Sequence, residues 1–209
     1  MRPAGIWCVV FVAALVAACR GPKYQEGQGE MSFFITSVRA ADSGNFGGLA
    51  GADAHCLKLA QAVESPKREW RAYLSADAID GAPAVNARDR IGRGPWFNAV
   101  GVQIAADLES LHGDNLLNQD TALSELGDII DGRIHDIVTG SKSDGTLQEG
   151  ATCRAWTSDG PYTIVGHHNR MGGGEIPRSW NAAHATDNCR LQGFQRSDGD
   201  VRFYCFALD

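Results

Sequence analysis

The spacing of apolar and polar residues changes along the chain, and this change predicts a domain that mixes strands with helix. Met31 to Val38 is β-branched and aromatic, which is typical of a strand. From Ala52 to Val63 the apolar residues recur at helical spacing, which predicts a helix. Its apolar face comprises Ala52, Cys56, Leu59, Ala60 and Val63. Trp70, Ala72 and Leu74 then alternate with Arg71, Tyr73 and Ser75, which predicts a half-buried strand.

Turns dominate the chain from Asn86 onward. The sequence contains 25 glycines and three Ser-Asp-Gly triplets, which favour tight turns. We expect a short helix over Ala105–Leu111 and strands over Tyr162–Gly166 and Arg202–Phe206. Residues 121–150 show no pattern that assigns them to either class. The pattern therefore predicts one loop-rich α+β domain over residues 31–209.

The first 18 residues are typical of a secretory signal. Arg2 precedes an apolar run from Ile6 to Ala18, which is too short to span a bilayer comfortably. The run ends in Val-Ala-Ala-Cys, which resembles a bacterial lipobox, so we expect Cys19 to be lipidated and to become the new N-terminus. Acyl chains on Cys19 would provide a membrane anchor. Arg20 replaces the Asp of an inner-membrane retention signal, which favours the outer membrane or cell surface. The alternative is ordinary cleavage after Ala18 with a free Cys19.

Residues 19–30 join this anchor to the domain. They are polar and contain Gly, Pro and Gln, which predicts a flexible tether. The formal charge of the whole chain is −6, and no basic cluster occurs in the sequence. Binding to a phosphate backbone needs clustered cations, so we expect no nucleic-acid partner. The sequence does not determine the oligomeric state.

Four cysteines remain after export and lipidation: Cys56, Cys153, Cys189 and Cys205. An even number in an exported chain predicts two disulfides, with three possible connectivities. The absence of any Cys-x-x-Cys pair argues against a zinc ribbon or a thioredoxin-like redox site.

The ordered set of motifs resembles a family of bacterial exported proteins called lectins, which are related to endostatin-like surface lipoproteins. The motifs are FFITS, GGLAGADAHC, WRAYLS, NARDRIGRGPWFNA, TGSKSDG, CRAWTSDG, GHHNRMGGG, SWNAAH and RFYCFA. This resemblance spans Phe33 to Ala207. It implies a C-type-lectin-like (endostatin-like) fold, with two short helices on a mixed, mainly antiparallel sheet and long irregular loops. It also implies nested disulfides, Cys56–Cys205 and Cys153–Cys189.

The chain departs from animal sugar-binding C-type lectins in the long loop. It lacks Glu-Pro-Asn and Gln-Pro-Asp, and Ala182 follows Trp180-Asn181 where those proteins have Asp. The sequence therefore establishes no cofactor. Calcium is the candidate, because Asn86, Asp89 and other loop residues offer the hard oxygen ligands that it requires. For Asp89 we expect instead ion pairs with the flanking arginines, Arg88 and Arg90.

The segment from His167 to His184 holds the candidate binding chemistry. Amide, charged and aromatic groups suit sugar recognition, and the candidates are Asn169, Arg170, Glu175, Trp180, Asn181 and His184. Core burial is the alternative for Trp180. A second interpretation is a metal set of His167, His184, Glu175 and Asp159. His167 and His168 are adjacent, so on a strand they point to opposite faces and do not share a metal.

These observations predict a surface-anchored, non-enzymatic, lectin-like lipoprotein that binds a glycan or a glycoprotein. One alternative is an adhesin for a protein partner, as the endostatin-like relatives suggest. Another is a metal-dependent exported hydrolase that uses His167, His168 and His184, although the sequence has no Gly-x-Ser-x-Gly or His-Glu-x-x-His motif.

Overall fold

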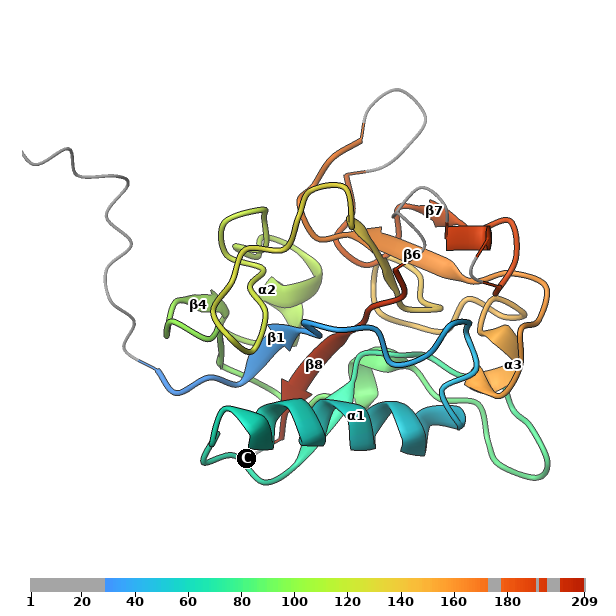
Figure 1. Cartoon of the computed structure of the whole chain (residues 1–209), viewed down its shortest axis with the longest axis horizontal. Helices are drawn as coiled ribbons and strands as arrows, with labels where there is room; N and C mark the ends of the chain where they lie inside the picture. The colour runs from blue at the N-terminus through green and yellow to red at the C-terminus, as the bar shows by residue number, and fades with distance from the viewer. Residues whose placement is uncertain (1–28, 173–177, 191, 195–199, 209) are drawn as a thin grey trace, which may run out of the picture.

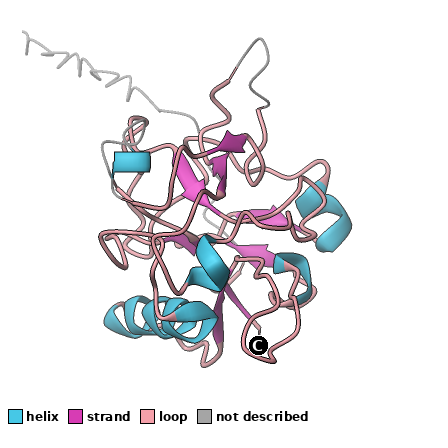
Figure 2. Cartoon of the chain, turned by 90° about the vertical axis from the view of Figure 1, so that its right-hand side faces the viewer, coloured by secondary structure: helices cyan, strands magenta, loops and turns pink. Residues whose placement is uncertain are grey.

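A computed structural model describes residues 29–172, 178–190, 192–194 and 200–208. The signal segment, Cys19, most of the tether and Glu175 lie outside these residues. Within them no helix has the length and apolar character needed to cross a membrane. Most of the described chain is loop and turn, as Figure 2 shows.

Three small antiparallel sheets and a few helices make an α+β fold. The first sheet has the order β1-β8-β2, from Phe33–Ile35, Tyr204–Ala207 and Trp70–Ala72. The second joins β3 (Trp96–Phe97) to β4 (Gln103–Ala105). The third has the order β5-β6-β7, from Asp136–Val138, Ile164–His167 and His184–Ala185. The expected single sheet is thus divided into three.

The α-helices are α1 (Gly48–Ala62), α2 (Leu108–His112) and the short segment α3 (Cys153–Trp156), and η1 (Ala87–Asp89) is a 3-10 helix. Helix α1 starts four residues before the predicted helix, after Gly47 in a left-handed conformation. Asp107 caps α2 by accepting a hydrogen bond from Ser110 N, and Ser110 Oγ accepts one from Asp107 N in return. Figure 1 shows α1 along one side of the β1-β8 sheet, with β6 and β7 at the other end of the molecule.

Both faces of the first sheet are buried. One face packs against α1 through Phe34, Trp70 and Ala72. The other face joins Phe33, Tyr204 and Phe206 to Trp96 of β3 and to Trp180 of the loop before β7. Tyr73 and Ser75, expected on an exposed face, are fully buried. Tyr73 packs in this second cluster, and Ser75 is hydrogen-bonded to Ser141 and Trp156. The half-buried strand prediction was therefore wrong at these two positions.

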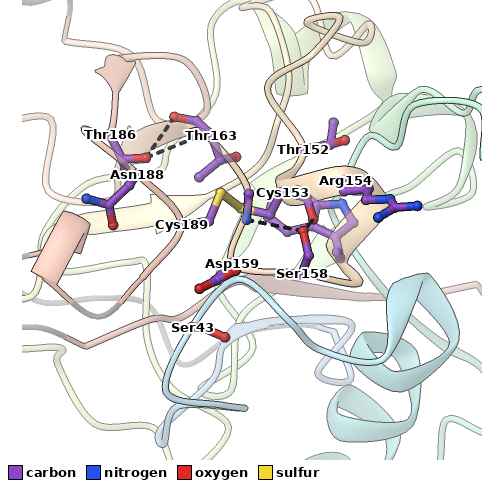
Figure 3. The surroundings of a disulfide bond; sticks show 12 residues. Ser43, Thr152, Cys153, Arg154, Ser158, Asp159, Thr163, Thr186, Asn188 and Cys189 are labelled. Carbon is purple, nitrogen blue, oxygen red and sulfur yellow. Dashed lines mark hydrogen bonds between the residues drawn. A yellow bond between two sulfur atoms is a disulfide. The ribbon is translucent and has the colours of Figure 1, made fainter.

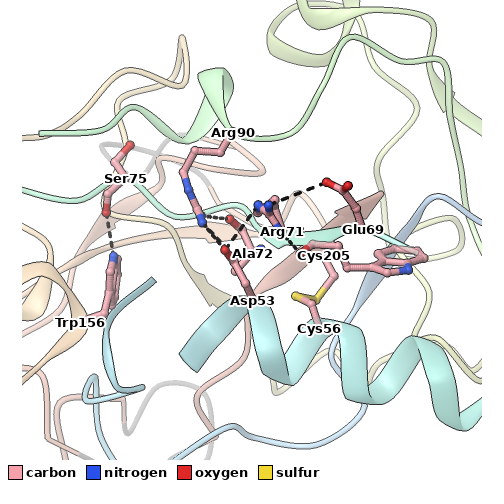
Figure 4. Close-up of polar contacts among 10 residues, drawn as sticks. Asp53, Cys56, Glu69, Arg71, Ala72, Ser75, Arg90, Trp156 and Cys205 are labelled. Atoms are coloured by element: carbon pink, nitrogen blue, oxygen red, sulfur yellow. Dashed lines mark hydrogen bonds and ion pairs between the residues drawn. A yellow bond between two sulfur atoms is a disulfide. The ribbon is translucent and has the colours of Figure 1, made fainter. Parts of the chain in front are cut away.

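The two disulfides pair Cys56 with Cys205 and Cys153 with Cys189, the connectivity that the resemblance implies. The first ties α1 to β8, and Figure 4 shows it beside an ion pair that serves the same junction. There Arg90 donates to both carboxylate oxygens of Asp53, at 2.9 and 2.7 Å, and to the Ala72 carbonyl. Arg90 was expected to pair with Asp89, but Asp89 instead accepts a hydrogen bond from Asn86.

The second disulfide braces an unusual turn. Residues Cys153–Trp156 form α3, and all four have left-handed backbone angles, with φ between 50° and 63°. This conformation costs roughly 1–2 kcal/mol for each non-glycine residue, so the surroundings must hold it. Trp156 Nε1 donates to the Ser75 carbonyl at 2.7 Å, and Cys153 is bonded to Cys189 (Figure 3). Gly44 packs on this disulfide so closely that a Cβ there would lie 2.4 Å from Cys153 Sγ.

Candidate metal centre

The third sheet brings chemically reactive side chains together from distant parts of the sequence. Asp136 of β5 lies directly opposite His167 of β6. His184 of β7 is paired with Val165, two residues before His167. Side chains two residues apart on a strand share a face, so Asp136, His167 and His184 meet on the same side. His135 immediately precedes β5 and completes the group.

A single carboxylate oxygen is the meeting point of three imidazole rings. Asp136 Oδ1 lies 3.1 Å from Nε2 of His167 and 3.4 Å from Nε2 of both His135 and His184. The ring centroids of His135 and His184 lie 4.7 and 5.1 Å from that of His167. We call these four residues the His–Asp cluster. The metal-ligating atoms of His135, Asp136 and His167 all lie within 4.8 Å of one another.

The cluster is largely shielded from water. Asp136 is 2% exposed and His167 3% exposed, whereas the side chains of His135 and His184 are 20% and 16% exposed. Burial raises the pKa of Asp136, but the interactions with His167 and His184 lower it more. The pKa of this carboxyl group therefore lies well below its usual range, and Asp136 is ionised.

Backbone carbonyls orient each of the three rings through its other nitrogen. Nδ1 of His135 lies 3.1 Å from the Gly132 carbonyl, and Nδ1 of His184 lies 2.9 Å from the Ala185 carbonyl. Nδ1 of His167 is bonded to the Met171 carbonyl in the same way. A carbonyl only accepts hydrogen bonds, so Nδ1 carries the hydrogen and Nε2 of the neutral ring presents a lone pair. A neutral ring in this orientation offers its Nε2 lone pair to a metal ion, whereas a charged ring donates from Nε2 to Asp136, and it is that hydrogen bond that lowers the pKa of the carboxyl group.

Close packing around Gly166 holds β6 and the segment before β7 in place. A Cβ at Gly166 would lie 1.8 Å from the Trp180 carbonyl oxygen, so only glycine permits this approach. His167 N donates to the Ser179 carbonyl at 2.8 Å. Tyr204 in the central sheet donates to the Trp180 carbonyl at 2.6 Å. The segment that leads to His184 is therefore fixed against both β6 and the core.

The residues expected to contact a sugar are mostly used inside the fold. Trp180 is 2% exposed and packs against Tyr73 and Tyr204, so the core alternative is correct for it. Asn181 is 1% exposed, and its Nδ2 donates to Tyr73 Oη and two backbone carbonyls. Arg170 donates to the Leu117 carbonyl and to Asn115, while Asn169 donates to the Gly132 carbonyl. These four side chains brace the loop. The expected ligand contact is wrong for the buried Trp180 and Asn181, whereas for the partly exposed Asn169 and Arg170 it stays a prediction.

The expected metal set is only partly assembled. His167 and His184 converge, whereas Asp159 lies elsewhere and pairs with Arg190 at 2.8 Å. Glu175 lies outside the described residues. His168 is fully buried and is not a member of the cluster. Burial lowers the pKa of His168 to about 4, so this ring stays neutral.

The sequence interpretation missed His135 and Asp136. They fall in residues 121–150, where no element was assigned. The available signal was a His-Asp pair followed by the β-branched run Ile137-Val138-Thr139, which is typical of a short strand. Only the pairing of β5 with β6 makes this signal a site.

No protein-family model matches the chain, and no curated protein is significantly similar to it.

Proposed function

We propose that this chain is the metal-binding domain of an exported, surface-anchored binding protein, and that the His–Asp cluster holds one transition-metal ion. The observation that carries this proposal is the convergence of three oriented Nε2 atoms on Asp136 Oδ1. Lone pairs and a carboxylate repel one another unless positive charge lies between them. Three adjacent imidazolium rings would themselves repel, so one bound cation is the better source of that charge.

The distances fit a first-row metal ion. Zinc binds imidazole nitrogen and carboxylate oxygen at about 2.0–2.2 Å, so tetrahedral ligand atoms lie about 3.3 Å apart. The three distances to Asp136 Oδ1, 3.1 to 3.4 Å, match this spacing. The ligand atoms of His135, Asp136 and His167 also lie within 4.8 Å of one another, a group that does not include His184. Nitrogen ligands favour zinc, copper or nickel over calcium, which prefers oxygen. The Nδ1 bonds to carbonyls are the outer contacts that fix metal-bound histidines in the correct tautomer.

Metal analysis tests the proposal directly. Protein made without a polyhistidine tag should contain about one equivalent of zinc, copper or nickel by plasma mass spectrometry. His184→Ala and His135→Ala should each lower zinc affinity at least about tenfold in a competition titration with a chromophoric chelator. His55→Ala is the matched control, because His55 lies on α1 outside the cluster. Equal zinc affinity in His184→Ala and His55→Ala would refute the proposal.

A separate observation favours lectin-like recognition of a glycan or glycoprotein as a second function of the domain. Beside the Cys153–Cys189 disulfide lies a shallow polar depression of about 600 Å³. Figure 3 shows Ser43, Ser158 and Asp159 in this region. Hydroxyl and amide groups line it, together with two Asp–Arg pairs, Asp42–Arg39 and Asp159–Arg190. Such balanced charge suits a neutral, polyhydroxylated ligand.

Glycan-array binding by the soluble domain tests this second function. Ser158→Ala and Asp159→Asn should reduce the signal, whereas Asp114→Asn, at an exposed residue outside the depression, should not. Binding to a protein partner without any glycan signal would support the adhesin alternative instead. We propose no catalytic role, and the hydrolase alternative loses His168 because that ring is outside the cluster.

A further inference from the structure

Four segments that are distant in sequence meet at the end of the domain where the described chain begins. They form a pocket of about 280 Å³, lined by residues 30 and 32, Lys67, residues 93–97 and residues 207–208. Backbone hydrogen bonds hold this junction together, because Ser32 N donates to the Phe97 carbonyl and Ala207 N donates to the Ser32 carbonyl, both at 2.9 Å. We call this space the terminal pocket. The strands β6 and β7 lie at the other end of the molecule (Figure 1).

Two weakly paired cations border the terminal pocket. Arg93 is exposed, and its side chain forms no ion pair or hydrogen bond with any described residue. Lys67 Nζ lies 3.9 Å from Glu30 Oε2, at the outer limit of an ion pair, and the Glu30 side chain is 68% exposed. The formal charge of the whole chain is −6, so two cations beside one carboxylate make this pocket a local site of attraction for an anion.

The rest of the rim is apolar, and this indicates which anion fits. Leu208 is 37% exposed, Pro95 is exposed and Phe97 is partly exposed. A free inorganic ion gains nothing from these side chains, whereas a phospholipid offers both a phosphate and the apolar beginning of its acyl chains. The volume corresponds to roughly nine water molecules of about 30 Å³ each. That space accepts a phosphate with its glycerol and excludes a whole acyl chain.

We propose that the terminal pocket binds the headgroup of an anionic phospholipid in the membrane that anchors the chain. The inference rests on the proposed anchor at Cys19 and is independent of the metal centre. Residues 20–28 join Cys19 to the first described residue, and nine residues reach at most about 32 Å. Anchoring therefore keeps the pocket close to the bilayer, where a weak headgroup contact acts at a high effective concentration. The domain then holds β6, β7 and the His–Asp cluster away from the membrane (Figure 1).

Vesicle binding by the mature chain, residues 19–209 with Cys19→Ser, tests this surface without any contribution from acyl chains on the protein. The chain should cosediment with phosphatidylcholine vesicles that contain about 30% phosphatidylglycerol, and much less with phosphatidylcholine alone. Arg93→Gln and Lys67→Gln should each weaken this binding about fivefold, the usual contribution of one cation at an anionic surface. Arg154→Gln is the matched control, because Arg154 is exposed on α3 outside the pocket and its loss changes the net charge equally.

The outcomes separate this inference from the proposed anchor. Equal binding to both kinds of vesicle would overturn the inference, and so would an equal loss in Arg154→Gln and Arg93→Gln. Binding of inorganic phosphate in a calorimetric titration, without binding to the anionic vesicles, would assign the pocket to a free ion and overturn it as well. If the full-length chain needs detergent for extraction but shows no vesicle preference, the anchor stands and this inference alone fails. Release of the full-length chain by buffer alone would refute the anchor and the orientation together.

Discussion

Asp136 and His167 lie 31 residues apart in sequence and face each other across β5 and β6, with Oδ1 of the first 3.1 Å from Nε2 of the second. This cross-strand pair is the centre around which His135 and His184 are arranged. Both members are buried, so their relative position depends on the sheet and not on a mobile surface loop. Metal binding at the proposed centre would therefore be linked to the stability of the domain.

Metal removal should lower the unfolding temperature. A ligand that binds only the folded state at a free concentration 100 times its dissociation constant adds about 2.7 kcal/mol to the unfolding free energy. We expect chelation and dialysis of a zinc-loaded sample to lower its free energy of unfolding by about this amount, measured by thermal unfolding. In His184→Ala the difference between the zinc-loaded and metal-free samples should nearly vanish. A chelation effect of the same size in both proteins would contradict a role for His184.

Gly166→Ala should destabilise the domain by about 3 kcal/mol or more, because its Cβ would overlap the Trp180 carbonyl oxygen at 1.8 Å. Urea unfolding measures the loss, and zinc affinity should fall with it since His167 and the segment before His184 must shift. Gly81→Ala is the control. Gly81 has a left-handed φ of 84° but nothing within 4 Å of its Cβ position, so it should cost only about 1–2 kcal/mol.

The two disulfides should contribute unequally. Cys56–Cys205 joins residues 149 positions apart, whereas Cys153–Cys189 joins residues 36 apart. The chain-entropy relation gives about 5 and about 4 kcal/mol for these loops. The double variant Cys56→Ser, Cys205→Ser should therefore unfold at lower urea than Cys153→Ser, Cys189→Ser. The reverse order would show that the support of the left-handed turn matters more than loop length.

Arg90→Met should cost about 3 kcal/mol, because it leaves the Asp53 carboxylate, 18% exposed, without its closest cation. Arg71→Met is the matched comparison. Arg71 lies 3.6 Å from the same carboxylate, but its side chain is 37% exposed, so its loss should cost less than about 1 kcal/mol. Chemical unfolding of both variants measures the difference. Equal costs would mean that the shorter, buried pair in Figure 4 adds nothing beyond surface attraction.

His112 should make stability fall in mild acid. Burial lowers the pKa of His112 below its ordinary value of 6.5, and the hydrogen bond to the Leu108 carbonyl only partly offsets this. The unfolded chain then binds the proton more readily, so the contribution of the neutral ring is complete above about pH 6.5 and declines as the pH falls through that value. In His112→Gln, unfolding free energies measured at about pH 7.5 and about pH 5.5 should differ less than in the unmodified protein. An unchanged difference would contradict this assignment.

The sequence predicted the local elements better than it predicted their surroundings. The periodicity from Ala52 to Val63 identified α1 and its buried face, because the apolar residues on the buried face of a helix recur at a fixed spacing. Tyr73 was placed on an exposed face because the strand pattern cannot show that Trp96 of β3 and Trp180 of a distant loop cover the second side of the sheet. Trp180 and Asn181 were predicted to contact a ligand because the sequence likewise does not show that distant segments bury them.

The sequence analysis identified two of the four residues of the His–Asp cluster. His167 and His184 were proposed as ligands because the family resemblance places residues 180–189 close to the loop, and they do converge. His135 and Asp136 were missed because their role depends on the pairing of β5 with β6, which is long-range information. Asp159 was included because it lay near in sequence, but its carboxylate is bound to Arg190.

The left-handed turn at Cys153–Trp156 has a consequence for chemical synthesis. A D-amino acid prefers the mirror image of the usual backbone basin, and four successive L-residues of this chain already occupy it. Arg154 has φ 55° and ψ 60°, the basin that a D-residue prefers. A semisynthetic domain with D-arginine at this single position should therefore tolerate, and even benefit from, inverted chirality where almost any other helical residue would not.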